Sequence, residues 1–215
     1  YPPYIIGGYE MMAHAAVEGL RARGHTVHVI TGRGRDLPSD GFTHSALDLD
    51  LDRKADYFLG GLPLTAGRVV RWHLLNPATR RAVQATLAQL QPDLIVSWSL
   101  YMASVAPLVA AHRYGAAPIV VQLADKWLLY SLYDIGALVP ATTWMQRAYI
   151  SGLRRFVQPL LRRWAQPDYI LAVSEFIRTL HTRVGFAEAQ SLATWWGINS
   201  ARFPFMLHAF PEDRP

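Results

Sequence analysis

The sequence lacks cysteine altogether and has little charge, and these two deficits exclude several classes of protein. Without cysteine among its 215 residues, the chain forms no disulfide and no thiolate metal site. Charged residues make up only 17%, while 7 Trp, 10 Tyr and 8 Phe supply much apolar surface, so the chain is not disordered. No apolar run approaches the roughly 18 residues that a membrane-spanning helix needs. The length suits one large domain or two small ones.

Lysine is also scarce, so the positive charge comes almost entirely from arginine. The chain has 2 Lys and 19 Arg against 16 acidic residues, which gives a net charge of +5. This excess permits an anionic partner without requiring one, and we expect no nucleic-acid partner.

Apolar spacing predicts alternating helices and strands. A helix is expected over residues 9–23, ended by Gly24 in a left-handed conformation, and a strand over 25–31. Asn76 and Pro77 predict the N-cap and first turn of a helix that continues to Leu90. The alternation indicates an α/β fold, with a doubly wound, mostly parallel Rossmann-like sheet, helices on both faces and strands buried on both sides. The later strands are expected at 93–98, 117–123 and 168–173, and the later helices at 101–114 and 174–184.

Residues 141–166 form a long helical pattern that Pro159 should interrupt. Within 144–166, five arginines occupy one half of the helix surface and five apolar residues the other. Such a helix either packs on the sheet with its arginines in solvent or lies on an anionic membrane. The arginines are Arg147, Arg154, Arg155, Arg162 and Arg163, and the apolar residues are Leu153, Val157, Leu160, Leu161 and Trp164.

Several motifs occur in an order that resembles one enzyme family. Gly7-Gly8-Tyr9-Glu10 opens a helix, Arg23-Gly24-His25 precedes a strand, and Pro92-Asp93-Leu94 begins another. Later come Val173-Ser174-Glu175 and Trp196-Gly197-Ile198-Asn199. The set resembles the N-terminal domain of the family 4 (group 1) glycosyltransferases, which have the GT-B architecture of two Rossmann-like domains facing a cleft.

The resemblance implies a retaining transfer of a sugar from a nucleotide-sugar donor to an acceptor hydroxyl on a glycan, lipid or small molecule, in carbohydrate biosynthesis. Hexosyl transfer is expected, with no cofactor and no metal. Gly7 and Gly8 match the loop that approaches the donor phosphates, a position where helix amides favour an anion. Ser174, Glu175 and Arg178 border the same cleft, although Ser174 also suits a plain N-cap.

The same resemblance places Asp125 where a carboxylate orders the acceptor hydroxyl or the transferred sugar, and this is the expected catalytic residue. An ordinary capping role is the alternative. Ala124 stands where the family usually has a histidine, so an orientation of the sugar that depends on this histidine is not expected here. Acceptor contacts are expected from Trp98, Lys126, Tyr130 and Tyr133, although Trp98 equally suits the core and the tyrosines equally suit packing under a lid.

Other interpretations of single motifs remain open. The carboxylates of Asp48, Asp50 and Asp52 share one face of a strand, where they either hold a divalent cation or form the solvated side of an outer strand. Gly32 and Gly34 follow a strand, as in a dinucleotide-binding oxidoreductase domain, but no helix follows them. A non-catalytic module that binds anionic membranes is the remaining alternative.

The resemblance also implies a domain plan. Residues 1–203 are expected to form the acceptor-side domain, without the family's first strand, and residues 204–215 to begin an interdomain linker. Most donor contacts and a spaced glutamate pair belong to the family's second domain, so we expect the 215 residues alone to transfer no sugar. The expected location is cytoplasmic, at most peripheral on the inner face of the membrane through the 144–166 helix.

Overall fold

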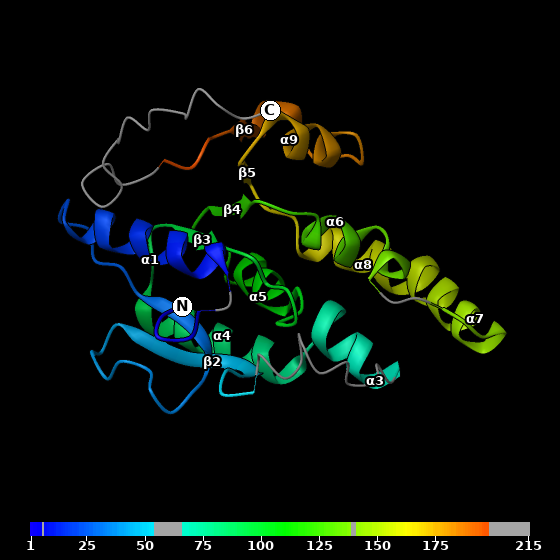
Figure 1. The fold of residues 1–215 in the computed structure, drawn as a ribbon, viewed down its shortest axis with the longest axis horizontal. Helices are drawn as coiled ribbons and strands as arrows, with labels where there is room; N and C mark the ends of the chain where they lie inside the picture. The colour runs from blue at the N-terminus through cyan, green and yellow to red at the C-terminus, as the bar shows by residue number, and fades with distance from the viewer. Residues whose placement is uncertain (6, 54–65, 139–140, 198–215) are drawn as a thin grey trace, which may run out of the picture.

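The computed structural model describes residues 1–5, 7–53, 66–138 and 141–197, which form an α/β domain with two parallel sheets (Figure 1). The smaller sheet pairs β1 (Val29–Arg33) with β2 (Thr43–Asp50). The larger has the order β3-β4-β5-β6, and all its neighbours are parallel. Its strands are β3 (Ile95–Ser97), β4 (Ile119–Leu123), β5 (Tyr169–Ala172) and β6 (Ser191–Ala193). The predicted parallel α/β fold is thus confirmed.

Helices alternate with these strands and end close to the expected residues. The helices are α1 (Gly8–Arg21), α3 (Ala66–Val69), η1 (Val70–Leu74), α4 (Pro77–Leu90), α5 (Ala106–Tyr114), α6 (Trp127–Leu132), η2 (Ile135–Ala137), α7 (Trp144–Gly152), η3 (Leu153–Val157), α8 (Gln158–Trp164), α9 (Glu175–Thr182) and η4 (Glu188–Gln190).

Two predicted helix ends are confirmed by their local geometry. The side-chain oxygen Oδ1 of Asn76 accepts hydrogen bonds from the N–H groups of Ala78 and Thr79 at 3.1 and 3.2 Å, so Asn76 caps α4. Gly24, after α1, has a φ of +89°, a value that costs glycine little. Capping chemistry is local, which is why the sequence alone places these ends.

The strand predicted at 25–31 was wrong in position. Pairing with β2 begins only at Val29, opposite Thr43, and continues through Gly32 to Arg33. Gly32 permits this because a side chain there would lie 2.6 Å from the Leu49 carbonyl oxygen. Gly32 and Arg33, which were expected to follow the strand, therefore belong to it, since the strand requires a glycine at its closest approach to β2.

The larger sheet has one buried face and one partly exposed face. Val121 and Leu123 on β4 are fully buried, and the buried residues of α5, which contacts β4, belong to the same core. On the opposite face Val96, Tyr169 and Leu192 are exposed. The prediction that every strand is buried on both sides is therefore wrong for the described residues, because apolar composition alone does not reveal which face is covered.

The predicted interruption at Pro159 takes the form of a π-helical turn. The N–H of Gln158 donates to the carbonyl of Leu153, five residues earlier, so η3 contains one residue more than an α-helical turn. The extra residue rotates the following turns, which buries Gln158 and leaves Leu160 half exposed. The predicted apolar face is thus confirmed at Leu153, Val157 and Leu161 but wrong at Leu160 and Trp164, which are exposed, because uniform helical spacing ignores the π turn. Among the described helices, none has the length and apolarity required to cross a membrane.

Candidate functional site

The candidate site lies at the carboxyl edge of the larger sheet, where the parallel strands all end. Trp98 follows β3, Asp125 follows β4, Ser174 follows β5 and Trp196 follows β6. Ligands of open α/β sheets bind outside this edge, because the loops and helix N-termini converge there. The fold thus brings together segments that are about a hundred residues apart in the sequence.

Three aromatic rings form a cluster at this edge. Tyr9, in the first turn of α1, meets Trp196 edge-on with 5.5 Å between ring centroids and Trp98 edge-on at 6.5 Å. Trp98 and Trp196 lie 6.0 Å apart. We call Tyr9, Trp98 and Trp196 the aromatic cluster. All three rings are only partly buried, so the cluster offers apolar surface beside the strand ends.

A hydrogen bond joins the aromatic cluster to the segment that carries Asp125. The Tyr9 hydroxyl oxygen accepts from the N–H of Ala124. Burial, with the negative charge of Asp125, raises the pKa of Tyr9 well above its usual value. Tyr9 is therefore a neutral phenol throughout the physiological range, and it acts as a contact and not as a base.

Asp125 sits in a setting that makes its carboxylate more basic than an exposed one. Burial raises its pKa, while the N–H of Trp127, which donates at 2.9 Å, and the nearby His181 act in the opposite direction. The expected capping contact is thus present, and it engages one oxygen of the carboxylate. Among the described residues, no other side chain donates to this carboxylate, so its second oxygen has no partner there.

His181 is fully buried on α9 near Asp125. Its Nδ1 lies 2.8 Å from the carbonyl oxygen of Ile177, and its Nε2 has no hydrogen-bond partner among the described residues. Burial lowers the pKa of His181, which favours the neutral ring. A hydrogen bond to the carbonyl requires the proton on Nδ1, so Nε2 is the free acceptor of a neutral imidazole.

The glycine pair opens α1 next to Tyr9. Gly7 is the N-cap and Gly8 the first helical residue, and a side chain at either position would meet nothing within 4 Å. The Gly7 N–H donates to the Glu10 carboxylate at 3.1 Å, so the first turn already carries an acidic partner. Open space beside these glycines agrees with a close backbone approach by a ligand.

Ser174, Glu175 and Arg178 form a hydrogen-bonded group at the start of α9. Ser174 caps the helix by accepting from the N–H of Ile177 at 3.3 Å. The Arg178 guanidinium donates to Glu175 at 2.7 Å and to Glu188 at 3.3 Å, and these carboxylates raise its pKa. Arg178 is thus already paired with two acids in the absence of a ligand.

The residues expected to bind the acceptor make different contacts in the structure. The Lys126 ammonium lies 5.8 Å from the centre of the Phe176 ring, so it bridges the end of β4 and α9. The Tyr133 ring packs against Phe186 at 5.8 Å and lies under Arg162 at 4.9 Å. Tyr133 therefore has packing contacts of its own, as the second alternative for this residue predicted, while Tyr130 lies on α6.

Sequence reasoning missed the roles of Tyr9 and His181 and gave Trp196 only a place in the family pattern. Tyr9 directly follows the glycine pair and Trp196 directly precedes Gly197. Their position next to these motifs is the feature of the sequence that could have indicated them as site residues. Nothing in the sequence around His181 indicates that it lies near Asp125. Ile198 and Asn199, which complete the later motif, fall outside the described residues.

The acidic strand and the Gly-x-Gly pair both have structural explanations. Asp48 accepts hydrogen bonds from Arg33 at 2.9 Å, from Arg71 and from Asn76 at 3.0 Å, so this carboxylate is ion-paired and not solvated. In the described part of the chain, no three His, Cys, Asp or Glu residues are grouped as a metal site would require. A side chain at Gly34 would collide with the ring of Tyr4, and a loop follows, which disfavours a dinucleotide fingerprint.

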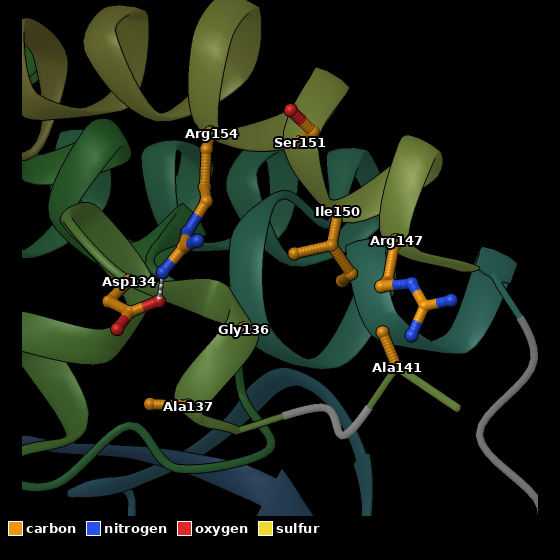
Figure 2. Close-up of a pocket in the computed structure, with 8 residues that line it drawn as sticks. All are labelled: Asp134, Gly136, Ala137, Ala141, Arg147, Ile150, Ser151 and Arg154. Atoms are coloured by element: carbon orange, nitrogen blue, oxygen red, sulfur yellow. Dashed lines mark hydrogen bonds and ion pairs between the residues drawn. The ribbon is translucent and has the colours of Figure 1, made fainter. Parts of the chain in front are cut away.

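A hollow of about 430 Å³ lies elsewhere, between η2 and α7 (Figure 2). Asp134 and Arg154 form an ion pair at one end, and the Arg147 side chain lies at the other. None of the residues predicted as catalytic or donor-binding lines this hollow. It is therefore separate from the candidate site at the sheet edge.

Comparison with known proteins agrees with the sheet-edge site. The model of Glycosyltransferase Family 4 matches residues 6–201. No curated protein and no solved structure matches the chain. The family match covers most of the chain. The α/β fold of the chain is that of one Rossmann-like half of a GT-B enzyme. The chain therefore belongs to glycosyltransferase family 4, as an N-terminal domain of that family.

Proposed function

We propose that this domain is the acceptor side of a retaining glycosyltransferase that moves a sugar from a nucleotide-sugar donor to an acceptor hydroxyl. The observation that carries the proposal is the Asp125 carboxylate at the end of β4, beside the aromatic cluster and across from the glycines that open α1. The proposal requires no metal ion and no cofactor.

Each part of the site has a role in this reaction. The free oxygen of Asp125 accepts a hydrogen bond from a substrate hydroxyl, and its raised pKa makes it a better acceptor for that proton. The aromatic cluster offers apolar surface to the face of a sugar ring. At the start of α1 the Gly8 amide faces the anionic donor phosphate, since a helix N-terminus favours negative charge, while the Gly7 N–H stays bonded to Glu10 and Gly7 leaves room for the phosphate. Orientation and charge stabilisation then supply most of the acceleration.

Ser174, Glu175 and Arg178 complete the proposed donor side. Arg178 is held by Glu175 and Glu188, so its position is fixed before a donor arrives. Lys126, Tyr130 and Tyr133 are proposed acceptor contacts, with Lys126 best placed because it directly follows Asp125.

The test is Asp125→Asn in the complete polypeptide that carries this chain. We expect kcat to fall by about a hundredfold or more, the usual contribution of a positioned acid or base, with donor affinity little changed. Asp93→Asn, at the opposite edge of the sheet, is the matched control and should keep wild-type turnover. A panel of UDP-, GDP- and ADP-sugars identifies the donor beforehand. Full turnover by the Asp125→Asn enzyme would contradict the proposal.

We also propose that the 215 residues alone transfer no sugar, because the family resemblance assigns most donor contacts to a second domain. The isolated chain is incubated with the same donor panel and candidate acceptors. Sugar transfer by the isolated chain would refute this statement but would leave the role of Asp125 open to the first test.

A further inference from the structure

The π turn gives the long helix from α7 to α8 one continuous buried side. Ile150, Leu153, Gln158, Leu161 and Ala165 are all buried, with spacings of three, five, three and four residues. The step of five falls at η3, where the Gln158 N–H bonds to the Leu153 carbonyl. The inserted residue thus keeps the buried side in line on both sides of Pro159.

The opposite side of this helix carries an apolar stripe. Positions 144, 148, 152, 156, 160 and 164 recur every fourth residue and are Trp, Ala, Gly, Phe, Leu and Trp. Trp144 and Phe156 are each 71% exposed, Leu160 is 50% exposed, and the neighbouring Met145 is also exposed. Exposed aromatic residues that line up along a helix indicate a surface that binds something apolar. We call Trp144, Phe156, Leu160 and Trp164, with Met145, the apolar stripe.

Arginines accompany the apolar stripe, and acids do not. No Asp or Glu occurs between Asp134 and Asp168, a stretch that contains five arginines. Arg154 pairs with Asp134, whereas Arg147, Arg155 and Arg163 form no ion pair with any described residue. The stripe is therefore bordered by unpaired positive charge, which suits an anionic surface.

The shape of this region fits a flat partner. The α7 end extends away from the sheets, and the helix from 144 to 164 is about 30 Å long at 1.5 Å per residue (Figure 1). Tryptophan occurs at both ends of the stripe, and this residue favours the boundary between water and lipid. A long, basic and aromatic surface matches a bilayer better than a protein groove.

From this arrangement we propose that the apolar stripe docks on the surface of an anionic lipid bilayer, with the helix in the plane of the headgroups. Trp144, Phe156, Leu160 and Trp164 enter the interface, and Arg155 and Arg163 contact lipid phosphates. The contact does not involve Asp125 or the aromatic cluster, so it is independent of the proposed reaction. It goes beyond that function by placing the domain at a membrane surface.

Vesicle sedimentation tests the proposal with the 215-residue chain. We expect binding to vesicles of phosphatidylcholine mixed with phosphatidylglycerol and little binding to phosphatidylcholine alone. Equal binding to both vesicles, or to neither, would overturn the proposal. Light scattering without vesicles measures self-association, and a stripe covered by a second copy in a stable dimer would also overturn it.

Matched variants assign the binding to named side chains. Phe156→Ser should weaken binding about tenfold, because a large apolar side chain no longer enters the interface. Phe176→Ser is its control, since Phe176 is a comparably exposed helical phenylalanine at 64% but lies on α9. Arg155→Gln with Arg163→Gln should weaken binding about thirtyfold in low salt. Arg81→Gln with Arg183→Gln removes the same charge elsewhere and should have a much smaller effect.

These variants alter exposed side chains, so circular dichroism should show an unchanged fold. If each stripe variant loses as much vesicle binding as its control, binding depends only on net charge or overall hydrophobicity, and the proposal fails. If the stripe variants alone lose binding, docking through this helix is supported.

Discussion

The phenolic oxygen of Tyr9 accepts a hydrogen bond from the backbone N–H of Ala124, a residue 115 positions further along the chain. The bond joins the first turn of α1 to the loop that carries Asp125. Since α1 has no fully buried residue among those described, this contact and the aromatic cluster do much to fix where the helix begins. The position of the glycine pair relative to Asp125 therefore depends mainly on the Tyr9 side chain.

Tyr9→Phe should destabilise the domain by about 1–2 kcal/mol, because the Ala124 N–H loses its acceptor in a partly buried site. Chemical denaturation measures the loss, and hydrogen exchange of the Ala124 amide should become faster. Tyr169→Phe removes a half-exposed hydroxyl and is the control, with an expected change below about 0.5 kcal/mol. Equal effects of the two variants would show that the Tyr9 hydroxyl has no special role.

Asp48→Asn should cost about 2 kcal/mol of unfolding free energy, since the Asp48 carboxylate is 11% exposed and holds two arginines and Asn76. Asn76 and Arg71 lower the pKa of this carboxyl, so its contribution persists until the pH falls through that lowered value. Asp50→Asn, two residues along the same strand, should change stability by less than about 0.5 kcal/mol. Thermal unfolding measures the loss of stability in both variants. Similar losses would contradict the prediction, because they would indicate a general effect of negative charge on the strand.

Burial lowers the pKa of His73 from 6.5 to about 4, which makes stability depend on pH. The unfolded chain takes up a proton below pH 6.5 while the folded chain leaves His73 neutral, so stability falls as the pH drops towards 4. The full difference is worth about 3 kcal/mol. His73→Phe should remove this part of the slope in urea unfolding measured across that range. The exposed His112→Phe controls for the loss of a histidine, and an unchanged slope in His73→Phe would contradict the prediction.

The sequence predicted features that depend on neighbouring residues. Asn76 and Pro77 located the start of α4 because capping is chemistry within one turn, and the alternating apolar segments indicated a parallel sheet before any pairing was known. The ordered motifs identified the family because each is a short contiguous string. Asp125 could be proposed as a site residue because the resemblance to the family expects a carboxylate just after the strand that ends at Leu123.

The remaining features depend on contacts between distant segments. No local pattern pairs Tyr9 with Ala124 or brings His181 near Asp125. The exposed face of the larger sheet escaped prediction because Val96, Tyr169 and Leu192 have the composition of buried residues. Likewise, Leu160 was assigned to the buried side because a uniform helical period does not include the π turn before Pro159.

The π turn places a polar residue in the core, where an apolar substitution is expected to destabilise the domain. Gln158 is buried, and its side-chain amide donates to the carbonyls of Tyr130 and Ser131 at 3.0 and 2.9 Å, at the end of α6. Gln158→Leu should therefore destabilise the domain by about 1–2 kcal/mol, although it makes the position more apolar. Leu160→Gln, at a half-exposed position, should change stability by less than about 0.5 kcal/mol. In an uninterrupted α-helix Leu160 would lie in the core, and Leu160→Gln would destabilise the domain more than Gln158→Leu. Urea denaturation of the two variants therefore shows whether the helix contains the π turn.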